Sequence, residues 1–154
     1  MVSESWRTRY FRWTMNFWPC YRGSGGRISY IARDWKEVRV KLRLSLRTYN
    51  YVGSIFGGSL YASVDPIYML MLIKCLGPGY VVWDKAAAIR FRKPGRSTLT
   101  ATFKLEDSEL DEIKYRLETE PKLDRSYRVE LVDANGIVHT EIDKTIHISK
   151  QKSP

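Results

Sequence analysis

An almost wholly apolar run, residues 51–76, most constrains how this chain can fold. A membrane span needs about 20 apolar residues, so the run is long enough to cross a bilayer. However, it holds Asp65, Pro66 and three glycines, and no lysine or arginine before Lys74 can pair with the carboxylate. A carboxylate in mid-bilayer is costly. The run therefore predicts a helix buried on all sides in a protein core and ended by Gly-Pro-Gly at 77–79, with no membrane span.

Other segments alternate apolar and polar residues in the pattern of half-buried antiparallel strands. In residues 38–47, valine and leucine occupy one face and mainly arginine and lysine the other. Asn135-Gly136 fits a type I′ turn before the last strand, and residues 107–117 a short connecting helix. The predicted strands are 38–47, 80–92, 97–105, 127–131 and 138–148, with Val138, Ile142, Ile146 and Ile148 on one face of the last.

These elements predict an α+β fold in which a curved antiparallel sheet of five or six strands wraps a central apolar helix. The length of 154 residues favours a single domain. We divide it into an N-terminal helix with a Gly-rich loop (1–26), a core (27–149) and a short polar tail (150–154).

The first 18 residues predict an amphipathic helix with an aromatic stripe, because Trp6, Tyr10, Trp13 and Phe17 recur at helical spacing. One interpretation is that the stripe packs on the domain and the arginines face water, which is the general behaviour of amphipathic helices in soluble chains. The other is a helix that binds a membrane surface or an anion. We favour the first. The Pro19 to Gly26 segment is expected to end the helix in a loop.

The net charge of +9 is concentrated in one part of the chain. Residues 1–100 carry 17 basic and 5 acidic side chains, whereas residues 101–154 carry 9 and 12. Such a positive field attracts a nucleic acid, an anionic membrane surface or a phosphorylated small ligand. Composition alone does not choose among these.

The cysteines and histidines argue against several kinds of site. Cys20 and Cys75 cannot form a disulfide framework, and no zinc-ligand spacing includes them, so we expect a cytoplasmic protein without a metal. His139 and His147 lie out of phase with the apolar positions of the last strand, which predicts solvated surface histidines. We find no nucleophile elbow and no nucleotide-binding glycine motif.

Asp65 is the strongest candidate for chemistry. A single carboxylate in an apolar helix should be paired, hydrogen-bonded or open to a cleft. Buried carboxylates of this kind serve as general bases, but Asp65 can equally hydrogen-bond a neighbouring loop or cap a kink at Pro66. The residue taken alone leaves both interpretations open.

The segment upstream of Asp65 resembles the active-site segment of hotdog thioesterases of the phenylacetyl-CoA type. That family carries an Asn, a His-Gly-Gly six positions later, and an Asp nine positions after the His. Here Asn50, Phe56-Gly57-Gly58 and Asp65 keep this spacing. The resemblance extends over about residues 36–148, and it implies a hotdog fold and the hydrolysis of an acyl-CoA.

The family's site implies a role for each matching residue. Backbone N–H groups at Gly57 would stabilise the oxyanion, Asn50 would position the thioester or the water, and Asp65 would be the base or the nucleophile. The resemblance further implies a homodimer or homotetramer in which Asp65 of one subunit faces Asn50 and Gly57 of the other. It implies no cofactor beyond the coenzyme A of the substrate. The expected substrate-binding residues are Phe56, Gly58, Tyr61, Trp83, Asp84, Arg90, Arg92 and Lys93.

Two positions depart from the family's pattern. Phe56 replaces the histidine, and Trp83 or Asp84 stands where the family has a hydroxyl that helps hold the water. Asp84 with Lys85 is read either as a strand-end ion pair or as a partner of Asp65. A non-catalytic protein that binds acyl-CoA or lipid is the first alternative function. The second, less favoured, is binding of nucleic acid or a membrane surface through the basic strand and the N-terminal helix.

Overall fold

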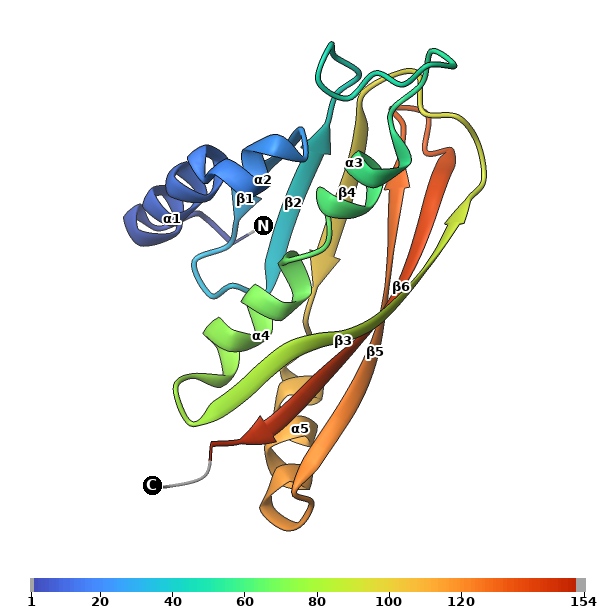
Figure 1. The fold of residues 1–154 in the computed structure, drawn as a ribbon. Coiled ribbons are helices and arrows are strands. Elements are labelled where there is room, and N and C mark those ends of the chain that lie inside the picture. Colours follow the sequence, from blue (N-terminus) through green and yellow to red (C-terminus); the bar gives the residue numbers. More distant parts are fainter. Residues whose placement is uncertain (1, 152–154) are drawn as a thin grey trace.

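The computed structural model describes residues 2–151 and has six strands in one antiparallel sheet, in the order β1-β2-β4-β5-β6-β3 (Figure 1). The central helix lies along the concave face of this sheet, and the N-terminal helices lie beside β1. This architecture confirms the predicted hotdog fold, a curved antiparallel sheet around a central helix with an extra N-terminal helix. The elements are α1 (Trp6–Phe17), α2 (Pro19–Gly23), β1 (Gly26–Ile31), β2 (Glu37–Leu42), α3 (Gly57–Ala62), α4 (Ile67–Leu76), β3 (Tyr80–Phe91), β4 (Leu99–Lys104), α5 (Asp107–Thr119), β5 (Lys122–Val132) and β6 (Val138–Lys150).

The central helix consists of two pieces, α3 and α4, and it is shorter than the apolar run. Residues 51–56 form a loop, and residues 63–66 form a turn between the pieces. Pro66 has no N–H to continue the helical ladder, and the helix resumes where Leu70 N–H donates to the Pro66 carbonyl at 3.0 Å. By length and composition Gly57–Leu76 could span a membrane. In this fold it is the core helix, with Leu60, Val64, Ile67, Met71 and Leu72 buried.

The strand predictions hold in the core of the sheet and fail at the C-terminal end of β2. β2 stops at Leu42, because Thr48 Oγ1 donates to the Arg43 carbonyl at 2.7 Å and closes a turn. Leu46, which the alternation placed on the buried face, is fully exposed as a result. The alternation is confirmed in β4, β5 and β6, with buried faces that include Leu99, Ala101, Phe103, Val129, Leu131, Ile142, Ile146 and Ile148, whereas residues 85–88 of β3 are all exposed.

The turn between β5 and β6 is not of type I′. That turn needs positive φ at both central residues, and only Gly136, at 77°, has it. Asp133 Oδ1 holds the turn instead, since it accepts the N–H groups of Asn135 at 2.9 Å and Ile137 at 3.0 Å.

The N-terminal helix is confirmed, but the favoured interpretation of its aromatic stripe is wrong. The stripe points to solvent, and Trp6, Tyr10, Trp13 and Phe17 are 55–70% exposed. The opposite face of α1 packs on the domain through other side chains, and Thr8 is its one buried residue. Beyond α1, Pro19 starts the short helix α2 where a loop was expected, and β1 begins at once at Gly26.

Candidate active site

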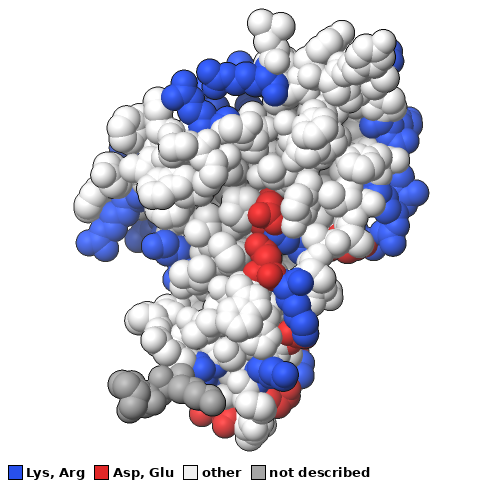
Figure 2. Space-filling model, in the orientation of Figure 1, with Lys and Arg blue, Asp and Glu red and all other residues white. Residues whose placement is uncertain are grey.

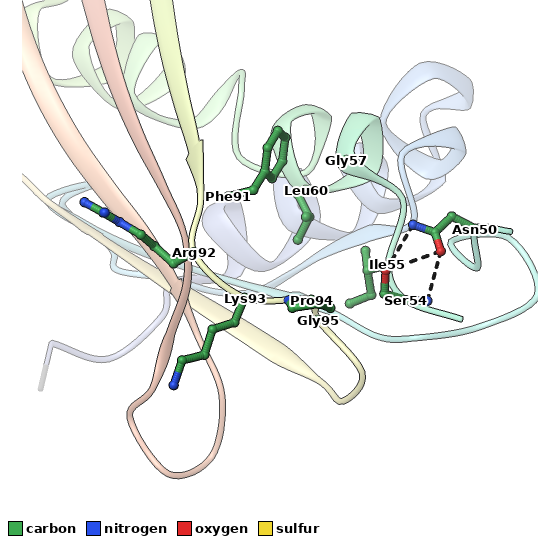
Figure 3. A pocket seen from close by; sticks show the side chains of 10 residues that line it. All are labelled: Asn50, Ser54, Ile55, Gly57, Leu60, Phe91, Arg92, Lys93, Pro94 and Gly95. Carbon is green, nitrogen blue, oxygen red and sulfur yellow. Dashed lines mark hydrogen bonds between the residues drawn. The ribbon is translucent and has the colours of Figure 1, made fainter. Parts of the chain in front are cut away.

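Four of the expected site residues meet at one pocket of about 350 Å³ (Figure 3). It lies between the loop before α3, the first turn of α3 and the end of β3. The sheet brings these segments together, because β3 pairs with β6 along its whole length and passes α4 before its last residue, Phe91, reaches Gly57 at the start of α3 (Figure 1). The lining residues are Asn50, Ser54, Ile55, Gly57, Leu60, Phe91, Arg92, Lys93, Pro94 and Gly95.

The Asn50 side chain organises the loop that leads into α3. Its Oδ1 accepts the N–H groups of Val52 at 3.1 Å and Ser54 at 2.9 Å, and its Nδ2 donates to Ser54 Oγ at 3.0 Å. Within residues 2–151, Nδ2 makes this one side-chain hydrogen bond, which leaves its second hydrogen for a ligand. Asn50 thus shapes the loop and keeps one donor at the pocket.

The two glycines at the start of α3 have different surroundings. A Cβ on Gly57 would lie 3.2 Å from Cζ of Phe91, so the glycine allows the Phe91 ring to approach the backbone. Gly57 and Phe91 both line the pocket. A Cβ on Gly58 would lie 2.3 Å from Cε1 of Phe56, whose ring folds over it. Phe56 itself is 57% exposed and does not line the pocket. The residue that replaces the family's histidine therefore does not fill this cavity.

Asp65 lies at a second place, in the turn between α3 and α4, and it is paired with a lysine. Lys144 on β6 has a fully buried side chain whose Nζ donates to Asp65 Oδ1 at 2.7 Å and also to the Asp65 carbonyl. The same Nζ lies 2.9 Å from Asp84 Oδ1 on β3, in an ion pair that is not aligned as a hydrogen bond. One buried ammonium therefore bridges two carboxylates that remain partly open to solvent, 39% for Asp65 and 23% for Asp84.

The environment of this acidic pair changes two pKa values. Burial raises the pKa of Asp84 above its usual value, and the nearby Asp65 charge adds to that rise, while Lys144 opposes it. Burial also raises the pKa of the Tyr61 phenol, and the neighbouring Asp65 carboxylate raises it further. Tyr61 lies at this cluster, since Lys144 Nζ is 5.6 Å from the centre of its ring.

Asp84 and Lys85 do not pair with each other. Adjacent strand residues point to opposite faces, and a β-bulge between 84 and 86 separates them further. Asp84 turns toward Lys144, whereas Lys85 binds Asp124 on the outer face at 2.5 Å. The interpretation of Asp84 as a partner of Asp65 is thus supported, with Lys144 as the group that joins them.

Three of the expected binding residues, Trp83, Arg90 and Arg92, have side chains that extend over the outer face of the sheet. Trp83 is half exposed and stacks on His147, with ring centres 4.6 Å apart. Arg90 is paired with Asp143 at 2.8 Å and Arg92 with Glu141 at 2.8 Å, and the Arg92 side chain extends away from the pocket (Figure 3). Within residues 2–151 no ion pair involves Lys93, which leaves it as the free cation at the rim.

The histidines are not solvated as predicted. His139 and His147 are 8% and 9% exposed. Nδ1 of His139 lies 3.1 Å from the Pro94 carbonyl, and Nδ1 of His147 lies 2.9 Å from Asp124 Oδ1. The strand face was predicted correctly, but neighbouring side chains and the loop after β3 cover it. Neither ring lines the pocket or contacts the Asp65 cluster, although the partner of His139, Pro94, is one of the pocket's lining residues.

The expected site is therefore divided in a single chain. Asn50 and Gly57 line the pocket, whereas Asp65 belongs to the cluster with Lys144 and does not line it. Lys144 was missed, although the sequence held a signal. It lies in phase with Ile142, Ile146 and Ile148, so the alternation places its charge on the buried face of β6. A lysine there needs an acidic partner.

Several solved structures have the same fold. A protein of unknown function from Pseudomonas aeruginosa, described as a probable thioesterase, superposes with a TM-score of 0.83 at 17% identity over 97% of this chain and 99% of that one. A protein of unknown function from Chlorobaculum tepidum gives a TM-score of 0.74 at 13% identity, over 94% and 95% of the two chains. A thioesterase from Haemophilus influenzae gives 0.69 at 14% identity, over 97% and 94%.

These likenesses establish the hotdog fold shared with thioesterases. No curated protein matches the sequence significantly. The family of domains of unknown function DUF4442 matches residues 7–148, which is nearly the whole chain. The chain therefore has the hotdog fold and belongs to the DUF4442 family, whose function is unknown.

Proposed function

We propose that this protein is an acyl-CoA thioesterase. The observation that carries the proposal is a carboxylate, Asp65, held by a buried lysine in the turn of the central helix, at the spacing from Asn50 and Gly57 that hotdog thioesterases use. The fold shared with thioesterases supports it, and so does a pocket lined by Asn50 and Gly57.

In the proposed reaction, water attacks the carbonyl carbon of the thioester. Asp65 takes a proton from this water through Oδ2, because Lys144 engages Oδ1. The backbone N–H of Gly57 and the free Nδ2 hydrogen of Asn50 donate to the oxyanion that forms. Since α3 has only six residues, direct hydrogen bonds rather than a helix dipole provide this stabilisation. The tetrahedral intermediate then collapses, the C–S bond breaks, and the thiolate of coenzyme A takes the proton from Asp65.

This reaction requires two copies of the chain, because one copy separates Asp65 from the pocket. β3 is at an edge of the sheet and exposes residues 85–88, so its free backbone groups can pair with a second β3. Such pairing continues the sheet across a twofold axis. It would also cover large apolar side chains that a single chain leaves exposed around the pocket, namely Tyr49, Tyr51, Val52, Phe56 and Phe91.

The phosphate end of coenzyme A would lie at the rim of the pocket near Lys93. Arg90 and Arg92 contribute less than the sequence suggests, because Asp143 and Glu141 already neutralise them. The acyl chain would lie along the apolar lining, where Ile55 and Leu60 are buried. The reaction uses no cofactor beyond the substrate.

A thiol-release assay on acyl-CoA esters with short, long and aromatic acyl groups tests the proposal. We expect hydrolysis of at least one ester, and a loss of about 10²–10⁴-fold in kcat/KM for Asp65→Asn. Asp111→Asn, an exposed carboxylate on α5, is the matched control and should keep full activity. Absence of hydrolysis with every ester, or full activity of Asp65→Asn, would contradict the proposal.

A second candidate is a protein that binds acyl-CoA without hydrolysing it. It is favoured by the pairing of Asp65 with Lys144, which occupies one oxygen of the proposed base, and by Phe56 in place of the family's histidine. Calorimetry with coenzyme A esters distinguishes the two. Tight binding without release of free thiol would support the binding protein.

A further inference from the structure

The outer face of α1 is a continuous aromatic surface that the rest of the chain does not cover. It consists of Trp6, Tyr10, Trp13, Phe17 and the following Trp18, which is 59% exposed. The ring centres of Tyr10 and Trp13 are 6.5 Å apart, and those of Trp13 and Phe17 are 5.0 Å apart. We call these five residues the aromatic ridge. Apolar surface of this extent on a folded protein is typical of an interaction site.

The ridge is held in place from its other side. A capping box between Ser5 and Thr8 starts α1, and Phe11 and Met15 pack against the core. Asn16 forms two hydrogen bonds with the backbone of Ile28, of 2.9 and 2.8 Å, at the free edge of β1. The helix is thus fixed to the domain with its aromatic side outward, and it cannot turn inward without losing these contacts.

The ridge is bordered by cations and not by acidic residues. The Arg7 guanidinium lies 5.4 Å from the Trp6 ring centre, and that of Arg22 lies 5.9 Å from the ring of Phe17. By helical geometry Arg9 lies on the flank opposite Arg7. None of these arginines has an ion pair within residues 2–151, and no acidic residue occurs between Glu4 and Asp34 in the sequence. Figure 2 shows cationic side chains beside the uncharged surface at this end of the molecule.

The positive field extends beyond α1. A second pocket of about 410 Å³ reaches from α1 to the outer face of β1 and β2 and is lined by the cations Arg27, Lys41 and Arg43, and by Arg12, whose charge Glu4 balances. Fields act over about 8–10 Å at physiological salt. A negatively charged surface that approaches α1 is therefore attracted by both groups of cations.

Charge argues against a second copy of the chain as the partner. In a twofold contact each side presents the same surface, so Arg7, Arg9 and Arg22 would face the same arginines with no acidic side chain to balance them. The sheet order also separates this surface from the proposed dimer contact, because α1 packs on β1 and β3 is the other edge strand.

We propose that the aromatic ridge docks on an anionic phospholipid membrane surface. Tryptophan and tyrosine favour the boundary between headgroups and acyl chains, and arginines beside them bind the phosphates. A convex ridge of rings fits a flat bilayer better than a single nucleic-acid strand, which such proteins hold in a groove. The inference does not depend on the proposed thioesterase activity, and the docked surface leaves the pocket at α3 free.

Co-sedimentation of the full chain with vesicles tests this inference. We expect binding to vesicles of phosphatidylcholine mixed with phosphatidylserine, much weaker binding to phosphatidylcholine alone, and a loss of binding as salt rises. The double variant Trp6→Ala/Trp13→Ala should bind about tenfold or more weakly. Arg7→Gln/Arg9→Gln should lose about fivefold per arginine removed.

Matched controls come from the far side of the molecule. Tyr115→Ala removes a ring that is 78% exposed on α5, and Lys114→Gln/Lys122→Gln removes two exposed cations, so both variants should bind as the native chain does. The inference is overturned if the native chain does not bind the anionic vesicles, or if the ridge variant binds them unchanged. It is also overturned if the ridge variant differs from the native chain in its oligomeric state, measured by light scattering, but not in its binding to vesicles. Tighter binding of the ridge to a single-stranded oligonucleotide than to vesicles would overturn it as well.

Discussion

Lys144 Nζ lies 2.7 Å from Asp65 Oδ1, and it is the only charged group of the described residues whose side chain is fully buried against this carboxylate. The pair joins the last strand of the sheet to the turn that interrupts the central helix, 79 residues earlier in the chain. Because Lys144 also contacts the Asp65 carbonyl and Asp84, it fixes the turn as well as the side chain. The candidate base is therefore positioned by the sheet and not by its own helix.

Lys144→Met should destabilise the fold by about 3 kcal/mol. The change leaves two carboxylates close together without the buried ammonium. This loss of unfolding free energy is at the low end of the range for removing one partner of a buried ion pair, because both carboxylates retain some contact with water. Urea unfolding followed by circular dichroism measures it.

The partner variant provides the control for this loss. Asp84→Asn in the Lys144→Met background removes the like charge beside Asp65, so the double variant should be more stable than Lys144→Met alone by about 1 kcal/mol. If the changes in unfolding free energy of the two single variants add up to that of the double variant, the arrangement in which Lys144 bridges the two carboxylates is contradicted.

The raised pKa of Asp84 predicts a specific pH dependence of stability. In the native state Asp84 holds its proton to a higher pH than in the unfolded chain, where its pKa is near 3.8. Between these two pKa values the native state binds more protons, so Asp84 contributes less stability as the pH rises through this window. Asp84→Asn removes that contribution.

As the pH rises from about 4, the stability of Asp84→Asn relative to the native chain should therefore increase, and the difference in unfolding free energy should then level off. Urea midpoints measured side by side over this range test it, and the comparison cancels the contributions of other carboxylates. A difference that stays flat or falls with pH would show that burial does not dominate at Asp84.

The neighbouring glycines of α3 should respond differently to alanine. Gly57→Ala puts a methyl group 3.2 Å from the Phe91 ring inside the pocket, and we expect a loss of about ten- to a hundredfold in thioesterase activity. Gly58→Ala displaces only the exposed Phe56 ring outside the pocket, so activity should change little. Both variants should remain folded, since both rings are more than half exposed and can move. Equal losses of activity would contradict the assignment of the pocket.

Ala86→Asp should separate the proposed dimer. Ala86 is exposed on the edge strand β3, where pairing with a second copy would bring two identical charges together. Light scattering should show a halved mass, and thioesterase activity should fall with it because the site needs both copies. Ala134→Asp, exposed in the turn between β5 and β6, is the control and should keep the native mass. A dimer that survives Ala86→Asp would place the contact elsewhere.

The two cysteines should differ in reactivity. Burial raises the pKa of the Cys75 thiol to about 11, and its Sγ donates to the Asp34 carbonyl at 3.6 Å. At pH 8 only about one thiol in a thousand is then ionised. Cys20 is exposed. Brief alkylation followed by mass spectrometry should label Cys20 first, and faster labelling of Cys75 would show that α4 opens readily.

The sequence by itself determined the architecture of the core. The strands β4, β5 and β6 show an alternation of apolar and polar residues, and the central helix shows an apolar run. Both are local patterns, which can be recognised in the sequence without knowledge of the tertiary structure. The Asn50, Gly57 and Asp65 spacing is a resemblance to a family, and the fold divides these residues between the pocket and the Lys144 cluster.

The tertiary structure decided which side chains meet. Lys144 reaches Asp65 because β6 lies beneath the helix turn, and Asp84 parts from Lys85 because a bulge and the strand pleat direct them apart. The aromatic stripe of α1 was visible in the sequence, but its direction was not. A second apolar pair on the same helix, Phe11 and Met15, together with the Asn16 hydrogen bonds to β1, fixes the opposite side to the domain. Periodicity shows that a helix has two faces, and only long-range contacts determine which of them is buried.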